Sequence, residues 1–198
     1  MKRIGITGPT GSGKTTVLRA LEKLGVAILD ADVIYYTLLR ENAELNARLV
    51  ERFGERILNA DGQIERKALG KLVFGDPAAL LDLNAITHGF VRREVDRLAE
   101  LARTEGKTAV AVDAIALVES GMADDCDSVV AVVAPAEVRV RRIMARDGIS
   151  EDYARSRVMA QQPEKFYRQH SDLVLENDGS ETPEAFEARA LTALRPLI

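Results

Sequence analysis

The sequence predicts an α/β protein in which a parallel sheet carries helices on both faces. Short apolar runs alternate along the chain with segments of helical periodicity. A glycine-rich loop joins the first apolar run to the first helical segment, and a long block without strand character separates the second run from the third. Such alternation is typical of parallel sheets that are buried on both faces. The 198 residues, 46% of them hydrophobic, suffice for one domain with one or two sub-domains.

The first strand is expected at residues 2–7, and the stretch Gly8–Thr15 that follows fits the pattern G-x-x-x-x-G-K-[ST]. Glycines let such a loop turn tightly and aim its N–H groups at phosphate oxygens, beside the N-terminus of a helix. In this pattern the charge of Lys14 binds the β and γ phosphates, and the hydroxyl of Thr15 binds Mg²⁺. We expect a nucleoside triphosphate to be bound by Gly11, Ser12, Gly13, Lys14, Thr15 and Thr16.

Two carboxylates follow the second expected strand, Val26–Leu29, which comes after a helix at Lys14–Lys23. Open α/β sheets bind ligands beyond the carboxyl ends of their strands, so Asp30 and Asp32 are candidate functional residues. A helix is expected at Val33–Leu39, and Asp30 suits its N-cap. The two roles are compatible, because one aspartate can cap the helix while the other takes part in the reaction.

A helical block follows between the second and third strands. Its expected helices are Ala43–Phe53, Arg66–Phe74, Ala78–Asn84 and Thr87–Thr104. The block is too large for an ordinary crossover connection. We interpret it as an inserted helical sub-domain, which in a kinase would hold the acceptor.

The third strand, at residues 109–112, ends at Asp113. An aspartate there resembles the position that contacts hydrated Mg²⁺ in proteins with this kind of loop, but a helix cap or a loop salt bridge is an equal alternative. The fourth strand, at residues 128–133, precedes a helix at 137–146. That helix carries a basic cluster able to bind a small anion: Arg139, Arg141, Arg142 and Arg146.

A polar helix at residues 151–160 follows, with Arg155 and Arg157, and its charge favours a mobile lid over a solvated hairpin. The fifth strand is expected at residues 172–177. Thr182 and Pro183 then open the last helix as N-cap and first residue.

The composition excludes or disfavours several classes of partner and several kinds of site. The net charge of −4 argues against a nucleic-acid binder. The single cysteine, Cys126, excludes an internal disulfide, and two distant histidines disfavour a histidine metal site. We find no signal peptide and no membrane span, so we expect a cytoplasmic protein.

Further short motifs recur in a fixed order: Leu24–Asp32, Phe53-Gly54, Asp61-Gly62, Ile64–Arg66, Leu69, Val73-Phe74, Leu83-Asn84, His88, Asp113–Gly121, Arg146-Asp147, Arg157, Gln161 and Asn177. With the glycine loop, their order and spacing resemble the dephospho-CoA kinase family over nearly the whole chain. Gly89 departs from the proline usual in that family, and Ile115-Ala116 departs from its Pro-Leu.

The resemblance implies a P-loop kinase fold with a five-stranded parallel sheet. Within a single domain, 1–198, the core would comprise about 1–34, 107–146 and 171–198, the helical CoA-binding insertion about 35–106, and the lid about 147–170. The implied reaction is phosphorylation of the 3′-hydroxyl of dephospho-CoA by ATP with Mg²⁺, giving CoA and ADP as the last step of CoA synthesis. A monomer is favoured.

The resemblance also suggests roles. Asp32 would be the base for the 3′-hydroxyl, supported by Asp30, and Arg146 would neutralise charge on the transferring group beside Lys14. Arg66, His88 and Gln161 are candidates for acceptor binding. Two alternatives stay open: a kinase of another small metabolite, and a regulatory NTPase that hydrolyses nucleotide without an acceptor.

Overall fold

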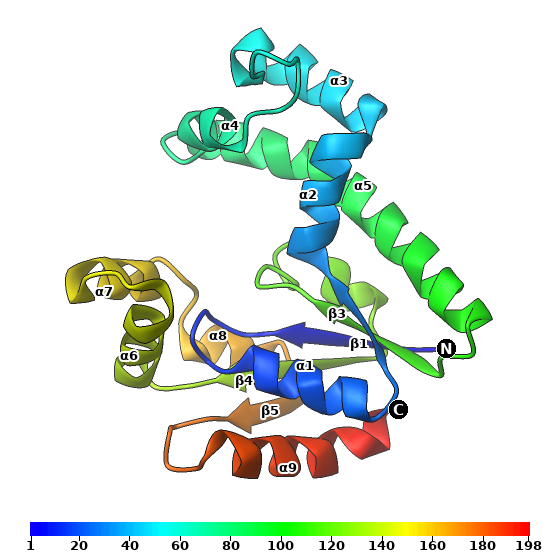
Figure 1. Cartoon of the computed structure of the whole chain (residues 1–198), viewed down its shortest axis with the longest axis vertical. Helices are drawn as coiled ribbons and strands as arrows, with labels where there is room; N and C mark the ends of the chain where they lie inside the picture. The colour runs from blue at the N-terminus through cyan, green and yellow to red at the C-terminus, as the bar shows by residue number, and fades with distance from the viewer. The chain divides into compact units, whose positions relative to one another are not determined.

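The computed structural model describes all 198 residues, which divide into two compact units. The first combines Met1–Leu29 with Ala99–Ile198, and the second consists of Asp30–Leu98. Figure 1 shows the sheet in the first unit and only helices and loops in the second. The second unit is thus a single insertion into the chain of the first.

The first unit contains a five-stranded parallel sheet in the order β2-β3-β1-β4-β5, which confirms the predicted fold class. The strands are β1 (Lys2–Thr7), β2 (Ala27–Asp30), β3 (Ala109–Asp113), β4 (Ser128–Val133) and β5 (Leu173–Glu176). Strand β1 is central and pairs with β3 and β4. The glycine loop therefore leaves the middle of the sheet at its carboxyl edge, where open α/β sheets bind ligands.

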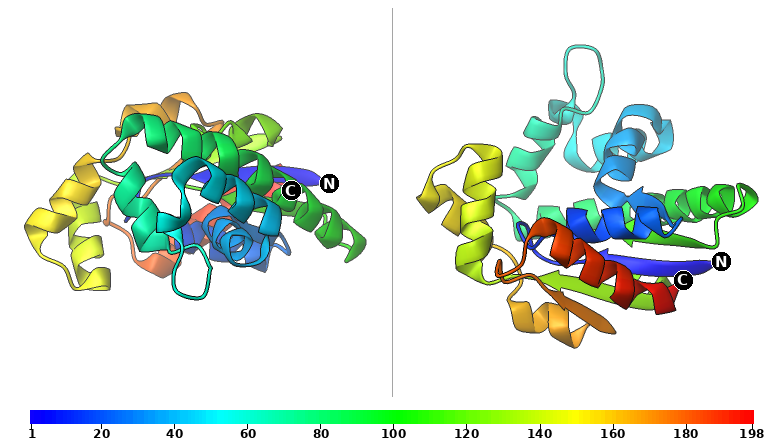
Figure 2. Two further views of the ribbon diagram at one scale, coloured as in Figure 1. Left: turned by 90° about the horizontal axis from the view of Figure 1, so that it is seen from above. Right: turned by 60° about the horizontal axis from the view of Figure 1, so that its bottom comes forward.

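Alternating side chains of the strands face two separate layers of helices. Ile4, Ile6, Val130 and Val132 pack with apolar residues of α1 (Lys14–Lys23) and α9 (Pro183–Leu194). These two helices lie side by side on one face of the sheet (Figure 2). On the opposite face, residues of β4 pack against Tyr167 of α8 (Glu164–Gln169). Burying each large apolar side chain contributes about 1.5–3 kcal/mol, so this core fixes the strand edge that carries the loop.

Helices α6 (Ala136–Asp147) and α7 (Glu151–Met159) form a pair with a small core of their own. Gly148 ends α6 with a φ of 64°, and the Ser150 hydroxyl accepts a hydrogen bond from the N–H of Tyr153 to cap α7. The short turns η2 (Met122–Asp125) and η3 (Arg195–Leu197) complete the unit. The tight turn at Gly148 aligns the two helices so that both present arginines near the loop.

The second unit contains α2 (Ala31–Glu41), α3 (Ala43–Phe53), η1 (Glu55–Ile57), α4 (Arg66–Val73) and most of α5 (Pro77–Thr104). The Asn42 side chain caps α3 by accepting from the N–H of Leu45 at 2.9 Å. Leu45, Leu49 and Ile57 are fully buried and form part of the interior. The helical character predicted for this block is therefore confirmed.

The prediction of two helices at Ala78–Asn84 and Thr87–Thr104 is wrong, because α5 continues through both as one helix of 28 residues. Neither glycine nor proline lies between Asn84 and Thr87, so nothing interrupts the backbone hydrogen bonds. Thr87 donates its hydroxyl to the carbonyl oxygen of Leu83 at 2.8 Å, which satisfies this polar group inside the helix. The short helix α8 was not predicted. No helix is long and apolar enough to cross a membrane.

Candidate active site

The stretch Gly8–Thr15, hereafter the phosphate loop, depends on glycine at positions where a side chain cannot fit. Gly8 and Gly13 have φ values of 133° and 105°, which L side chains rarely adopt. A Cβ at Gly8 would collide with the carbonyl oxygen of Val132, and one at Gly13 would collide with Nδ2 of Asn177. The loop therefore lies tightly against β4 and against the end of β5.

The phosphate loop lines a cavity of about 380 Å³. Its other lining residues are Ile115, Arg142, Arg146 and Arg157. Within the loop, the N–H of Ser12 donates to the carbonyl oxygen of Pro9, and the N–H of Thr10 donates to Gln161. Four further backbone N–H groups have no acceptor in the protein, those of Gly11, Gly13, Lys14 and Thr15. The cavity thus collects donors that an anion can satisfy.

Two side chains of the loop add to this donor set. Ser12 is fully buried, yet its hydroxyl oxygen has no hydrogen-bond partner. Lys14 places its ammonium nitrogen 4.0 Å from Oδ1 of Asp113, and both side chains are about one-seventh exposed, at 14% and 16%. Strand pairing sets Asp113 beside Ile6, one residue before the end of β1. A buried hydroxyl without a partner is costly, and a phosphate oxygen would be a suitable acceptor.

Three arginines from the helix pair supply positive charge to the cavity. Arg146 donates two hydrogen bonds to the adjacent Asp147, at 2.6 and 3.0 Å, and Arg157 donates a third at 2.6 Å. The two guanidinium groups hold the pKa of Asp147 well below its usual range, and the bond to Asp147 raises the pKa of Arg146. Arg142 completes the set. Guanidinium groups are donors of several hydrogen bonds and match phosphate oxygens in geometry and charge.

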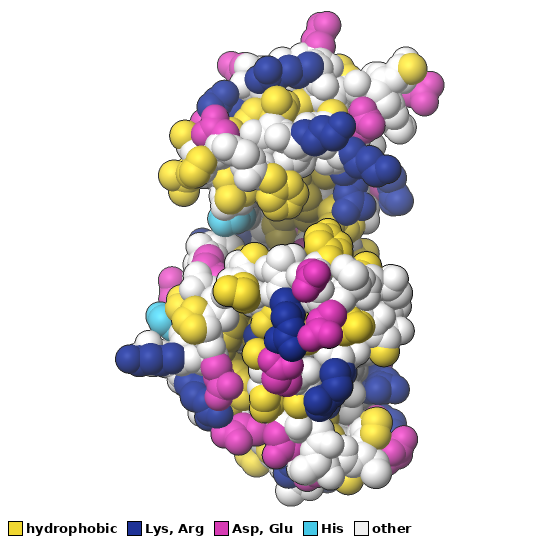
Figure 3. All heavy atoms as spheres, turned by 90° about the vertical axis from the view of Figure 1, so that its left-hand side faces the viewer, with side chains coloured by type: hydrophobic (Ala, Val, Ile, Leu, Met, Phe, Trp, Pro, Cys, Tyr) yellow, Lys and Arg dark blue, Asp and Glu magenta, His cyan; other side chains and the backbone are white.

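Elsewhere in the first unit the arginines are mostly neutralised by neighbours. Arg155 pairs with Glu137 and Glu151, each at 2.7 Å. The face shown in Figure 3 carries basic and acidic side chains interspersed rather than one patch of a single sign. At the cavity, by contrast, Arg146 and Arg157 share one carboxylate, that of Asp147, so the arginines there outnumber the carboxylate that pairs with them.

The second unit contains the expected acceptor-side residues. Asp30 accepts a hydrogen bond from the N–H of Val33 at 2.9 Å, which confirms its predicted role as the N-cap of α2. Asp32 follows in the first turn of the same helix and is exposed. His88 lies on α5, where burial and the charge of Arg92 lower the pKa of its imidazole.

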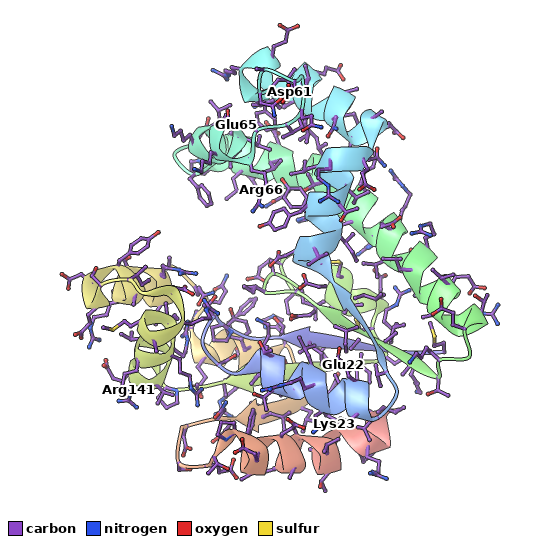
Figure 4. All side chains as sticks on the ribbon, viewed as in Figure 1. Glu22, Lys23, Asp61, Glu65, Arg66 and Arg141 are labelled. Carbon is purple, nitrogen blue, oxygen red and sulfur yellow. The ribbon has the colours of Figure 1, made fainter.

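Arg66 begins α4 and extends towards α2, as Figure 4 shows. Its guanidinium carbon lies 3.3 Å from the centre of the Tyr36 ring, an arrangement that favours a cation–π interaction. A cavity of about 1010 Å³ adjoins it within this unit. The lining residues are Asn59, Ile64, Glu65, Arg66, Lys67, Gly70, Lys71 and Phe74. This cavity has both apolar and cationic walls.

The structure brings together most of the residues expected around the nucleotide. Those that line one cavity are Gly11, Ser12, Gly13, Lys14, Thr15 and Arg146. Thr16 is not among the lining residues: its N–H donates to Gly13, and its hydroxyl accepts from Arg19 at 3.3 Å. Gln161 is bound to Thr10.

Of the basic cluster that the sequence predicted on this helix, Arg142 and Arg146 line the cavity and Arg139 and Arg141 do not. Neither Arg142 nor Arg157 was among the site residues that the sequence assigned. A signal existed for Arg142, since it precedes Arg146 by four residues and thus shares a face of the same helix. For Arg157 the signals were the charge of its helix and its place among the motifs of the family resemblance. The contact of Asn177 with the loop had no signal in the residues alone.

Comparison with known proteins gives a consistent result. The family model described as dephospho-CoA kinase matches residues 2–183. A dephospho-CoA kinase of Geobacter sulfurreducens is 42% identical over 190 residues, covering 96% of this chain and 95% of the relative. The crystal structure of a Thermus thermophilus protein superposes with a TM-score of 0.81 at 39% identity, covering 98% and 96% of the two chains. A dephospho-CoA kinase from Campylobacter jejuni gives 0.71 at 26% identity, with 100% and 98% covered.

Proposed function

Because the chain belongs to the dephospho-CoA kinase family, we propose that it transfers the γ-phosphoryl group of ATP to the 3′-hydroxyl of dephospho-CoA, giving CoA and ADP. The observation that carries this proposal is the cavity at the phosphate loop, where unpaired N–H groups, a buried hydroxyl and three arginines converge. Phosphoryl transfer depends on positioning and on neutralising the charge of the phosphates, and these groups provide both.

On the nucleotide side, the free N–H groups of the phosphate loop would bind the β-phosphate, and Lys14 would bridge the β and γ phosphates. Arg146 would neutralise the charge that develops on the transferring group. Thr16 is proposed as a further nucleotide contact, next to the residues that line the cavity. Each of these groups is a donor or a cation, as a polyanionic ligand requires.

Mg²⁺ is the proposed cofactor. The donors available for it are the hydroxyl of Thr15, which lines the cavity, and the carboxylate of Asp113, 4.0 Å from Lys14. Both are hard oxygen ligands, and Mg²⁺ is usually held by one or two such side chains together with phosphates and water. The residues therefore fit the ion, Asp113 acting through a water molecule. When bound, Mg²⁺ neutralises charge on the phosphates.

On the acceptor side, we infer that Asp32 hydrogen-bonds the 3′-hydroxyl and accepts its proton, with Asp30 in a supporting role. Arg66 and His88 would bind dephospho-CoA within the helical insertion, about 35–106, and the segment 147–170 would act as the lid. The mixed apolar and cationic cavity beside Arg66 supports this assignment, since the acceptor carries both a diphosphate and a pantetheine arm. A single monomeric domain in the cytoplasm stays a prediction.

The proposal is tested by measuring ATP turnover with and without dephospho-CoA, and with a panel of nucleoside monophosphates and sugar acids at equal concentration. We expect ADP release only when dephospho-CoA is present. Equal turnover without any acceptor would indicate a regulatory NTPase, and faster turnover with another acceptor would indicate a different small-molecule kinase.

A further inference from the structure

Arg139 is a buried charged residue that does not line the cavity, and only 6% of its surface is exposed. It lies on α6, behind the phosphate loop. Its Nε donates to the carbonyl oxygen of Thr10 at 3.0 Å, and its Nη2 donates to Oε1 of Gln161 at 2.6 Å. A guanidinium group taken out of water needs such acceptors, because an unpaired buried charge is strongly unfavourable.

Gln161 holds the same loop residue from a second direction. Its Oε1 accepts from the N–H of Thr10 at 3.0 Å, and its Nε2 donates to the Thr10 hydroxyl at 3.1 Å. With the bond from Arg139, the N–H, the carbonyl and the hydroxyl of Thr10 are all engaged. One arginine and one glutamine thus fix every polar group of this residue.

The carbonyl groups of the next two loop residues, Gly11 and Ser12, also accept hydrogen bonds from side chains behind the loop. Arg142 donates to the carbonyl oxygens of Gly11 and Ser12 at 3.2 and 3.3 Å, and Asn177 donates to that of Ser12 at 2.9 Å. Fixing the oxygen end of a peptide group fixes the direction of its planar N–H as well. Side chains behind the loop therefore set where the loop's donors point.

We propose that Arg139 and Gln161 are positioning residues that act jointly through Thr10 to aim the donors of the phosphate loop at the nucleotide. Neither is assigned a contact with the reacting atoms. The assignment rests on the proposed function only in that the loop binds a nucleotide. It also moves Gln161 from the acceptor side, where the family resemblance suggested it, to the nucleotide side.

The test uses a double-mutant cycle with Arg139→Met and Gln161→Met, which keep side-chain length and remove the hydrogen bonds. Matched controls are Arg141→Met and Gln162→Met, neighbours that are exposed. Arg141 extends from α6 away from the sheet (Figure 4). Gln161→Glu keeps the acceptor oxygen for Arg139 and Thr10 and is the conservative variant. Each variant is assayed by ADP titration calorimetry, steady-state kinetics and melting temperature.

We expect each of the two single variants to weaken ADP binding and to lower kcat/KM for ATP on the order of 10-fold or more, since hydrogen bonds to charged groups are lost. The double variant should be no worse than the more damaged single one, because both act through Thr10. The KM for dephospho-CoA at saturating ATP should not change. Gln161→Glu should recover most of the ADP affinity, and the controls should match the unmodified chain.

Three results would overturn the proposal. The first is that both single variants bind ADP as the controls do, whatever their melting temperatures. The second is that their effects multiply fully in the double variant. The third is that Gln161→Met raises only the KM for dephospho-CoA. If Arg139→Met fails to fold, Arg139→Lys takes its place in the cycle. The ADP titration needs no acceptor, so it decides the matter even if dephospho-CoA proves not to be the substrate.

Discussion

Lys14 illustrates how one residue links the local motif to the chemistry of the site. It begins α1, lines the cavity and lies 4.0 Å from the carboxylate of Asp113. The position therefore suits a cation that meets a phosphate. Because its side chain faces the cavity, its removal should affect ligand binding more than folding.

Lys14→Ala is expected to lower kcat by a factor on the order of 10² or more, as the loss of a preorganised electrostatic group does. Steady-state kinetics with ATP and dephospho-CoA measure the loss, and thermal unfolding checks the fold. Lys107→Ala, at an exposed position between α5 and β3, is the control. Near-normal turnover of Lys14→Ala would mean that the loop does not bind the phosphates as proposed.

Asp32→Asn should lower turnover by ~10²–10⁴-fold, the usual range for general-base assistance, with little change in ATP affinity. Asp30→Asn should cost less, because asparagine can also accept the N-cap hydrogen bond that Asp30 accepts from Val33. Both variants are assayed with dephospho-CoA at saturating ATP. If Asp30→Asn is the more damaged enzyme while its fold is intact, then Asp30 is the base.

The sequence predicted the residues of the phosphate loop because the motif is contiguous and each position has its own chemical reason. It did not predict what holds the loop from behind. Gln161 is 151 residues from Thr10 and Asn177 is 165 residues from Ser12, so only the folded sheet brings them together. Side-chain spacing along the chain carries no information on such pairs.

Among the secondary-structure elements, the pair α6–α7 presents Arg146 and Arg157 to the cavity through a shared bond to Asp147. A closing lid contributes mainly after both substrates are bound. Arg146→Ala should therefore lower kcat with a smaller change in the dissociation constant for ATP. Stopped-flow binding and steady-state rates give the two quantities, and equal losses in both would favour a plain binding role over a lid.

The continuity of α5 leads to a second prediction about the secondary-structure elements. Ala85 is exposed and lies between the two helices that the sequence predicted, at a point where the structure has an unbroken helix. Ala85→Gly should lower the free energy of unfolding by about 1 kcal/mol, the cost of glycine in a helix interior. Ala60→Gly, in an exposed turn, is the control. Urea unfolding that gives equal values for both variants would contradict a continuous helix.

Elements with a local start or stop signal were predicted well. Thr182 and Pro183 open α9 as N-cap and first residue, as expected. Elements that lack such a signal were predicted poorly or missed. Asn84 and Thr87 are weak helix formers, yet the stretch that they bound stays helical because tertiary packing outweighs weak local preferences. Helix α8, with six residues, is too short to produce a clear periodicity.

At the scale of the whole molecule, the chain consists of a sheet unit into which a helical unit of residues 30–98 is inserted. The sequence predicted the insertion at about 35–106 from the size of the strand-free block. The two descriptions differ at α2 and α5. The prediction divided α2 after residue 34, whereas the whole helix lies in the second unit, and it placed all of α5 in the insertion, whereas the helix from Ala99 onward belongs to the first unit. The site residues proposed for the nucleotide lie in the first unit, and those proposed for the acceptor, Asp30, Asp32, Arg66 and His88, lie in the second.

The most direct measurement of the central claim is identification of the products formed from ATP, Mg²⁺ and dephospho-CoA. Mass spectrometry quantifies CoA and ADP, and phosphorus NMR locates the new phosphate on the ribose, with Lys14→Ala as the matched control. We predict CoA and ADP in equal amounts, with the new phosphate on the 3′-oxygen. ADP formed without CoA, or a phosphate at any other position, would contradict the account.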